Sequence, residues 1–211
     1  SQIPQNTDKL TISFVGSIYR WHAWESFIAE FSRILETNRF DIDLYFIGVN
    51  IAADIECYVD GLPEKSARSI HVLPKLANTE LLSLIATHNV LLLFNYYAFM
   101  GTKIYDYIGV NRKILFCYTN DPESNRLKKA HYLLQNNPPT IETLQVDLLR
   151  EKDAGIIIDN IDGLEQALID LVMEFDENKR IHSSVHNRDD LSRKGQVAKL
   201  AKLIRTITEK K

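Results

Sequence analysis

The stretch of sequence that decides the fold is NVLLLFNYYAFMGTKIYDYIGVNRKILFC, residues 89–117. Its apolar runs at 90–94 and 114–118 predict two strands, and the first has the continuous apolar character of a strand buried on both faces. Between the runs, a loop that contains Gly101 precedes a helical pattern starting near Ile104. Strand, loop, helix and strand in this order predict a crossover unit of a parallel sheet.

The loop and the start of this helix are the first candidate binding site. Ligands of parallel α/β sheets bind beyond the carboxyl ends of the strands, where Gly101, Thr102 and Lys103 are expected to lie. The free N–H groups at the start of a helix can hold a phosphate group. Asp106, one turn inside the helix, offers a carboxylate that can accept hydrogen bonds from sugar hydroxyls.

The rest of the chain continues the alternation of strands and helices. Further strands are expected at 10–15, 42–47, 70–73 and 155–158, and further helices at 23–35, 51–59, 80–87, 121–134, 140–150, 164–175 and 192–208. Asn78 and Thr79 are expected to cap the helix at 80–87. This order predicts an α/β fold with a doubly wound parallel sheet of about six strands. It allows a Rossmann-like arrangement without proving it.

Composition limits the kinds of partner. The 211 residues include 25 basic and 28 acidic ones, a formal net charge of -3, so no global basic field attracts nucleic acid or anionic lipid. No apolar run is long enough to span a membrane.

Cys57 and Cys117 are expected to be buried free thiols. Residues 1–9 are polar, lack an initiator Met and are expected to be a linker, which suggests a fragment of a longer protein.

A second candidate loop, Gly16-Ser17-Ile18-Tyr19-Arg20, follows the first expected strand. A dinucleotide fingerprint needs three glycines in G-x-G-x-x-G spacing, and only Gly16 is present, so NAD or FAD binding is disfavoured. Gly16 still permits close approach of the backbone, and Arg20 could reach a diphosphate. The alternative is a structural turn that carries a surface arginine.

Lys103 and Asp106 allow two interpretations. They lie three residues apart on one helical face and could form a surface ion pair worth only ~0.3 kcal/mol. However, a lysine at a helix N-terminus opposes the helix dipole, so a negative partner is expected nearby. That partner is either Asp106 or the phosphate of a ligand.

Histidines and aromatic residues give weaker signals. His182 and His186 are spaced to share a helical face, but the segment lacks the glutamate of H-E-x-x-H and a third ligand, so no metal site is expected. His22, near the Gly16 loop, could face a ligand, but a place at the surface is favoured. Several aromatic residues flank the two loops and either stack on a ligand or pack beneath the loops, and packing is favoured for Trp24: Trp21, Trp24, Tyr96, Tyr97 and Phe99.

Together these segments resemble the C-terminal, nucleotide-sugar-binding domain of GT-B-fold glycosyltransferases of the bacterial group-1 family. ISFVGSIY at 12–19 resembles the first strand and phosphate loop, and 43–48 resembles the second strand with its final glycine. IHVLPKLANTEL at 70–81 is similar to the base-binding segment, and GTKIYDY at 101–107 resembles GTKxxEY. Residues 191–204 resemble the C-terminal helix that crosses back to the other domain. The resemblance covers nearly the whole chain.

The resemblance assigns roles to individual residues. It implies that the backbone near Lys75 and Leu76 contacts the base and that Asp106 holds the ribose hydroxyls. The sequence also departs from the family pattern, because Ala98 stands where many relatives carry a first glutamate and Asp106 is shorter than the second. Pro74 replaces the usual glycine before the base loop, and the G-R-P turn reads NRK at 111–113.

The implied organisation is a linker at 1–9, a donor-nucleotide-binding domain at 10–185, and a helix at 186–211 that packs towards a missing N-terminal domain. The implied function is the donor-binding half of a glycosyltransferase of bacterial polysaccharide biosynthesis. It would move a sugar from a nucleoside diphosphate sugar, UDP-linked for example, to a glycan or lipid-linked acceptor, with no metal or other cofactor.

The catalytic groups are not assigned, and this chain alone is expected to be inactive. The expected location is the cytoplasm or the inner face of the membrane, where the full-length protein could associate peripherally, without nucleic acid as a partner. Two alternatives stay open: a degenerate, non-catalytic interaction domain of the same fold, and a sugar-nucleotide epimerase.

Overall fold

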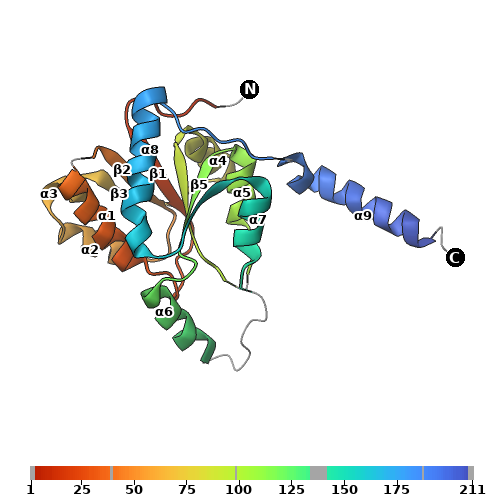
Figure 1. The fold of residues 1–211 in the computed structure, drawn as a ribbon, viewed down its shortest axis with the longest axis horizontal. Helices are drawn as coiled ribbons and strands as arrows, with labels where there is room; N and C mark the ends of the chain where they lie inside the picture. Colours follow the sequence, from red (N-terminus) through yellow and green to blue (C-terminus); the bar gives the residue numbers. More distant parts are fainter. Residues whose placement is uncertain (1–2, 39, 98, 134–141, 187, 209–211) are drawn as a thin grey trace.

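The structure, a computed structural model, describes residues 3–38, 40–97, 99–133, 142–186 and 188–208. Within these residues, six parallel strands form one sheet in the order β3-β2-β1-β4-β5-β6 (Figure 1). The strands are β1 (Leu10–Val15), β2 (Ile42–Ile47), β3 (Ile70–Leu73), β4 (Val90–Phe94), β5 (Lys113–Cys117) and β6 (Gly155–Ile158). The expected Rossmann-like, doubly wound parallel sheet is confirmed.

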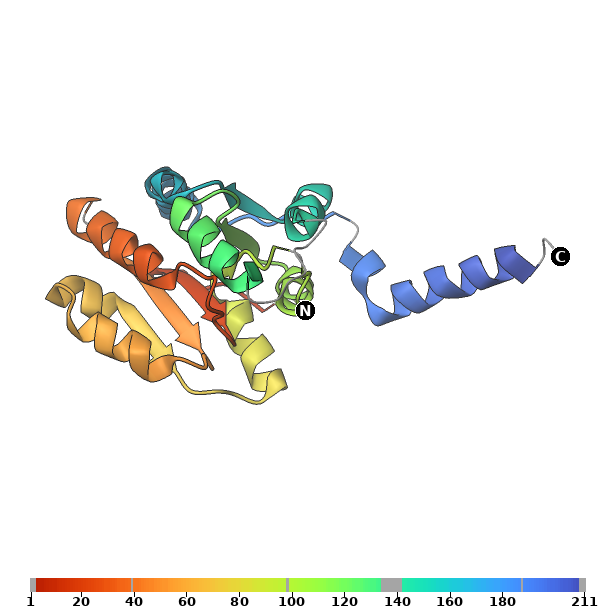
Figure 2. The same cartoon turned by 90° about the horizontal axis from the view of Figure 1, so that it is seen from below.

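Helices cover both faces of the sheet (Figures 1 and 2). One face packs against α1 (Trp24–Asn38), α2 (Ala52–Asp60), α3 (Glu64–Ser69) and α8 (Leu164–Asn178), and the other against α4 (Asn78–Thr87), α5 (Lys103–Val110) and α7 (Leu144–Lys152). Helix α6 (Pro122–Leu133) lies beyond the carboxyl ends of the strands. Two short 3-10 helices, η1 (Ile161–Gly163) and η2 (Arg188–Leu191), precede α8 and α9 (Arg193–Thr208), and α9 projects away from the sheet.

The central strands are apolar throughout because both of their faces are covered. All five side chains of β4 are buried, and they alternate between the two layers of the core. Leu92 and Phe94 join the layer under α1 and α8, whereas Leu91 and Leu93 join the layer under α5 and α7. The continuous apolar run that marked this strand in the sequence thus reflects burial on both faces.

Side chains hold β1 at both of its ends, to the start of β4 at one end and to α5 at the other. At the amino end, the Asn89 side-chain oxygen accepts hydrogen bonds from the Thr11 N–H and the Thr11 hydroxyl, both at 2.8 Å. At the carboxyl end, the Val15 N–H donates to the Tyr107 hydroxyl of α5 at 3.0 Å. These bonds set α5 directly over the end of β1.

The structure corrects several local expectations. Helix α3 was not expected, and α4 begins at Asn78 without a side-chain cap, so Asn78 and Thr79 do not cap it. Cys57 is exposed, whereas Cys117 is buried as expected. Ala98 lies outside the described residues.

Arg112, which precedes β5, is a buried structural residue with 2% of its surface exposed. Its Nε donates to the backbone oxygens of Ala86 at 2.9 Å and His88 at 3.1 Å, and its other nitrogens donate to further carbonyls, including that of Ile3. Ala86 lies in the last turn of α4, where carbonyls have no partner within the helix. The guanidinium therefore closes the end of α4 and ties the N-terminal segment to the sheet.

We expect Arg112→Ala to lower the free energy of unfolding by about 3 kcal/mol or more, because several buried carbonyls lose their donor. Arg126→Ala is the matched control, since Arg126 forms an exposed ion pair with Glu123. Loss of this ion pair should lower the free energy of unfolding by about 1 kcal/mol or less. Urea unfolding of both variants measures the difference, and similar small losses would contradict the structural role of Arg112.

Candidate functional site

Four loops meet at the carboxyl edge of the sheet. Gly16 follows β1, Gly48 follows β2, Leu76 lies beyond β3, and Gly101 ends the loop after β4. The three glycines have positive φ angles of 77°, 62° and 67°, a conformation that favours glycine. The strand order reverses between β1 and β4, which is the position at which ligands of such sheets bind.

Lys103 crosses from the start of α5 to the Gly16 loop. Its Nζ donates hydrogen bonds to the Ser17 backbone oxygen at 3.0 Å and to the Tyr96 hydroxyl at 2.8 Å. It also lies 4.6 Å from the centre of the Phe14 ring. A Cβ added to Gly16 would lie 2.8 Å from Lys103 Cε, so the glycine makes room for the lysine. The structure thus brings Gly16, Ser17 and Lys103 into contact.

Lys103 has an unusual electrostatic environment. The acceptors that it contacts are a carbonyl and a hydroxyl, both neutral, and burial lowers its pKa to about 7. At neutral pH the ammonium group therefore carries its charge only part of the time. An anion beside it would favour the charged form, because opposite charge offsets the cost of desolvation.

Asp106 does not neutralise Lys103. Among the contacts of the described residues there is no ion pair between them, and the Asp106 side chain has no hydrogen-bond partner there. The carboxylate is exposed at the surface of α5, and partial burial raises its pKa above the ordinary value. The surface ion pair considered from the sequence is thus not formed, and Asp106 is available to a ligand.

The loop after β4 is held by side chains that the sequence did not single out. Asn95 donates to the Tyr118 backbone oxygen at 2.9 Å and accepts from the Tyr97 N–H at 2.7 Å. Gln145 of α7 accepts from the Tyr96 N–H at 2.7 Å and donates to the Met100 oxygen at 2.8 Å. Tyr96 is thereby positioned to meet Lys103. Apart from the local bond between Tyr97 and Asn95, these contacts link residues 23 to 49 positions apart, so no local pattern could predict them.

His22 is buried, with 3% of its surface exposed, so its expected place at the surface is wrong. Its ring packs against Phe14, Phe94 and Tyr96, and its Nδ1 accepts from the Tyr19 N–H at 3.3 Å. Burial, followed by the charge of Lys103, lowers the pKa of His22 to about 3. His22 is therefore a neutral packing residue beneath the Gly16 loop.

The flanking aromatic residues mostly pack beneath the loops. Trp21, Tyr96 and Tyr97 are buried, and Trp24 packs edge-on against Tyr58, with 5.7 Å between ring centres, as favoured. Phe99 differs, because 53% of its surface is exposed.

The remaining site residues are spread along the same edge. Arg20 is exposed and lines a hollow of about 920 Å³ with Trp24, Asp54 and Tyr58, between the Gly16 loop and α2. Lys75 lies close to Gly48, where an added Cβ would come within 3.2 Å of the Lys75 Cα. Leu76 packs against the layer of core under α5, and Thr102 immediately precedes α5 without a side-chain cap. Lys75 and Leu76 thus begin the loop after β3, whereas Arg20 faces a separate hollow.

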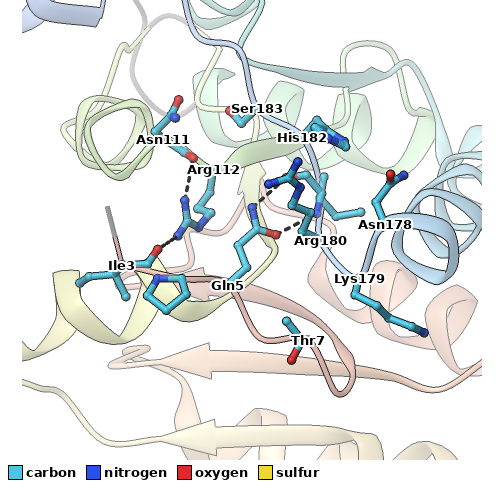
Figure 3. A pocket seen from close by; sticks show the side chains of 12 residues that line it. Ile3, Gln5, Thr7, Asn111, Arg112, Asn178, Lys179, Arg180, His182 and Ser183 are labelled. Carbon is cyan, nitrogen blue, oxygen red and sulfur yellow. Dashed lines mark hydrogen bonds between the residues drawn. The ribbon is translucent and has the colours of Figure 1, made fainter. Parts of the chain in front are cut away.

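A hollow of about 520 Å³ lies at the opposite, amino edge of the sheet (Figure 3). Its central polar groups are occupied: Gln5 exchanges two hydrogen bonds with the Ile181 backbone, at 2.7 and 2.8 Å, and Arg112 holds carbonyls. These bonds tie the segment before β1 to the segment after α8. The hollow is therefore a structural junction, and the carboxyl edge is the better candidate site.

The histidines at 182 and 186 do not share a helical face, because their segment is not helical. His182 Nδ1 lies 2.9 Å from Glu174, and His186 Nε2 lies 3.9 Å from Asp153. No cluster of three or more metal-ligating side chains occurs among the described residues. Within the same part of the chain, no helix combines the length and apolar character needed to cross a bilayer.

Solved structures share this fold. Sucrose-phosphate synthase from Thermosynechococcus elongatus matches with a TM-score of 0.62 and 13% identity over 97% of this chain and 47% of that one. The C-terminal domain of a glycosyl transferase group 1 family protein (LpcC) from Francisella tularensis matches at 0.51 and 13%, over 90% and 85%. A structure described as trehalose-6-phosphate from E. coli bound with UDP-2-fluoro glucose matches at 0.52 and 12%, over 82% and 38%.

These similarities show that the chain has the fold of the C-terminal domain of a GT-B glycosyltransferase, and that it spans about half the length of sucrose-phosphate synthase. No protein-family model and no curated protein sequence matches the chain.

The stability of the unliganded chain should rise with pH because of Lys103. Its pKa is about 7 when folded and 10.5 ordinarily, so between these values the unfolded chain binds more protons and stability increases with pH. Lys103→Met keeps the length of the side chain but removes the titration. We expect the wild type to gain stability relative to this variant from pH 7 towards pH 10, measured by urea unfolding. Parallel pH profiles would contradict a depressed lysine pKa.

Proposed function

We propose that the chain is the donor-binding half of a glycosyltransferase that transfers a sugar from a nucleoside diphosphate sugar, UDP-linked in the first instance. The observation that carries this proposal is the position of Lys103. It is a half-buried lysine with neutral partners, at the first turn of α5 and against the Gly16 loop, beside the point where the strand order reverses. A diphosphate would supply the missing negative charge.

The surrounding residues suit the other parts of such a donor. The N–H groups at the start of α5, next to Gly101 and Thr102, can donate to phosphate oxygens. The exposed Asp106 can accept hydrogen bonds from the ribose hydroxyls. The loop after β3, with Lys75 and Leu76, is the proposed contact with the base.

During transfer, negative charge develops on the leaving diphosphate. Lys103 and the positive end of α5 would stabilise that charge in the transition state. Arg20 is a second candidate, if the loop after Gly16 turns it towards the ligand. No metal ion is needed in this scheme, because the cationic groups come from the chain itself.

The acceptor is proposed to be a glycan or a lipid-linked sugar, bound by an N-terminal domain outside this chain. The LpcC relative is bacterial, and the proposed setting is polysaccharide biosynthesis, capsule included, in the cytoplasm or at the inner face of the membrane. The isolated chain would bind the donor without transferring its sugar. Two alternatives remain: a sugar-nucleotide epimerase of the same fold, and a non-catalytic domain, which Ala98 favours since an alanine cannot replace the family's first glutamate.

We expect the chain to bind UDP more tightly than NAD or ATP, with uptake of up to about one proton at pH 8. The reason is that Lys103, with a pKa of about 7, is mostly neutral before binding and becomes charged beside the diphosphate. Calorimetry in two buffers of different ionisation enthalpy measures both quantities. Lys103→Met should lose affinity and the proton uptake together. Tighter binding of NAD would contradict the proposal, and no binding of any nucleotide would favour the non-catalytic alternative.

Asp106→Ala should weaken UDP binding about ten- to hundredfold, because charge-assisted hydrogen bonds to the ribose would be lost. Asp106→Asn should recover part of this loss, since an amide oxygen still accepts. Glu56→Ala removes an exposed carboxylate from α2 and is the matched control. Affinity and melting temperature are measured on all three variants. Altered stability with unchanged affinity in Asp106→Ala would remove Asp106 from the donor site.

A further inference from the structure

The hollow that Arg20 faces is separate from the proposed donor site. It lies on the β2 side of the Gly16 loop, whereas Lys103 meets that loop from the β4 side. Its walls are the loop, the first turn of α1 and helix α2, and its volume is about 920 Å³. A further hollow of about 410 Å³, towards α6, shares Arg20, Trp24 and Glu25 with it, so the two adjoin. Both fall in the size range of small-molecule sites.

Charged side chains of both signs line the larger hollow without meeting. Arg20 of the loop, Glu25 of α1 and Asp54 of α2 are exposed, and none of these side chains has a hydrogen bond or an ion pair within the described part of the chain. In the adjoining hollow, by contrast, Arg126 pairs with Glu123 at 2.6 Å. The larger hollow thus offers donors and acceptors to a ligand that carries both kinds of group.

Aromatic side chains supply the apolar part of the lining. Trp24 and Tyr58 are half-buried, and they pack edge-on at the wall of the hollow. Tyr19, 41% exposed, lines it from the loop and stacks on Trp21 with 4.8 Å between ring centres. A sugar ring suits this lining, because its C–H groups can pack on aromatic rings while its hydroxyls donate to carboxylates and accept from a guanidinium.

His22, beneath the loop, adds a donor without an acceptor. It lines the adjoining hollow, and its buried Nε2 has no hydrogen-bond partner among the described residues. Because its Nδ1 accepts from the Tyr19 N–H, Nε2 carries the proton of the neutral ring. A buried donor without a partner lowers stability. An oxygen of a ligand in the adjoining hollow would supply the acceptor.

We propose that the Arg20 hollow binds a neutral oligosaccharide of about two or three sugar units. One ring packs on Trp24, and the hydroxyls bind Arg20, Glu25 and Asp54. An anionic ligand is disfavoured, because this lining holds two carboxylates and one arginine. A free amino acid would match the charges but fill only a small part of the space. The proposal goes beyond donor binding and does not depend on it.

Tryptophan fluorescence reports binding at this place, because the two tryptophans of the chain are Trp24, in the lining, and Trp21, stacked on Tyr19. The 211-residue chain is titrated with maltotriose, cellotriose, mannotriose and triacetylchitotriose. We expect a saturable change with at least one of them. Asp54→Ala should weaken that binding about tenfold, because a hydrogen bond to a charged group is lost, and should keep its affinity for UDP. Glu56→Ala, which removes an exposed carboxylate of α2 outside the hollow, is the matched control.

The thiol of Cys57 gives a second, independent readout of where the saccharide binds. Cys57 is exposed and lines the hollow, whereas Cys117 is buried, so a thiol reagent such as dithionitrobenzoate modifies Cys57 first. Saturating saccharide should slow this modification several-fold, and saturating UDP should leave it unchanged. Since each ligand is followed separately, loss of UDP binding and loss of saccharide binding are distinguishable.

Four results would overturn the proposal. The first is the lack of a saturable response to all four trisaccharides, and the second is an equal loss of affinity in Glu56→Ala. The third is a fluorescence response that leaves the reactivity of Cys57 unchanged, which would place the saccharide elsewhere. The fourth is protection of Cys57 by UDP, which would assign the hollow to the donor.

Discussion

The pairing of β1 with β4 is the constraint on which the site depends. The ladder between the two strands pairs Ile12 with Val90 and Ser13 with Leu91, and one further backbone hydrogen bond joins the Asn89 N–H to the Thr11 oxygen at 3.1 Å. Asn89 at one end and Tyr107 at the other supply hydrogen bonds that the short ladder cannot. Since the Gly16 loop follows β1 and the loop that leads to α5 follows β4, this pair fixes how Lys103 meets Ser17. Any change that loosened it would separate α5 from the Gly16 loop and remove the setting of Lys103.

The position of Lys103 is unfavourable for the stability of the unliganded chain but favourable for binding an anion. Lys103 is held among Phe14, Tyr96 and the backbone of Ser17, where burial disfavours its charge. A more stable chain would place an uncharged residue there, so the lysine is a local weakness of the unliganded fold. Such weaknesses are typical of binding sites, because the group that is poorly solvated without its ligand is the one that gains most when the ligand arrives.

More of the fold than of the candidate site could be predicted from the sequence. Apolar runs such as Val90–Phe94 mark buried strands directly, and glycines after strands mark the turns, so the sheet and its carboxyl edge follow from local patterns. Helix α3 was missed because six residues after Pro63 carry little periodic signal. The partner of Lys103 was missed for another reason: Tyr96 is positioned by Gln145, 49 residues away, and no local pattern reports such a contact. His22 was misplaced because its burial depends on the rings of Phe94 and Tyr96, more than 70 residues away in the sequence.

Net charge was the least informative of the sequence measures, because it averages two parts of opposite character. Outside residues 193–211, the chain has 18 basic and 27 acidic residues, obtained by subtracting the seven basic residues and the one acidic residue of that segment from 25 and 28. The segment at 193–211 is therefore basic and the rest of the chain acidic, a difference that the net charge of -3 conceals.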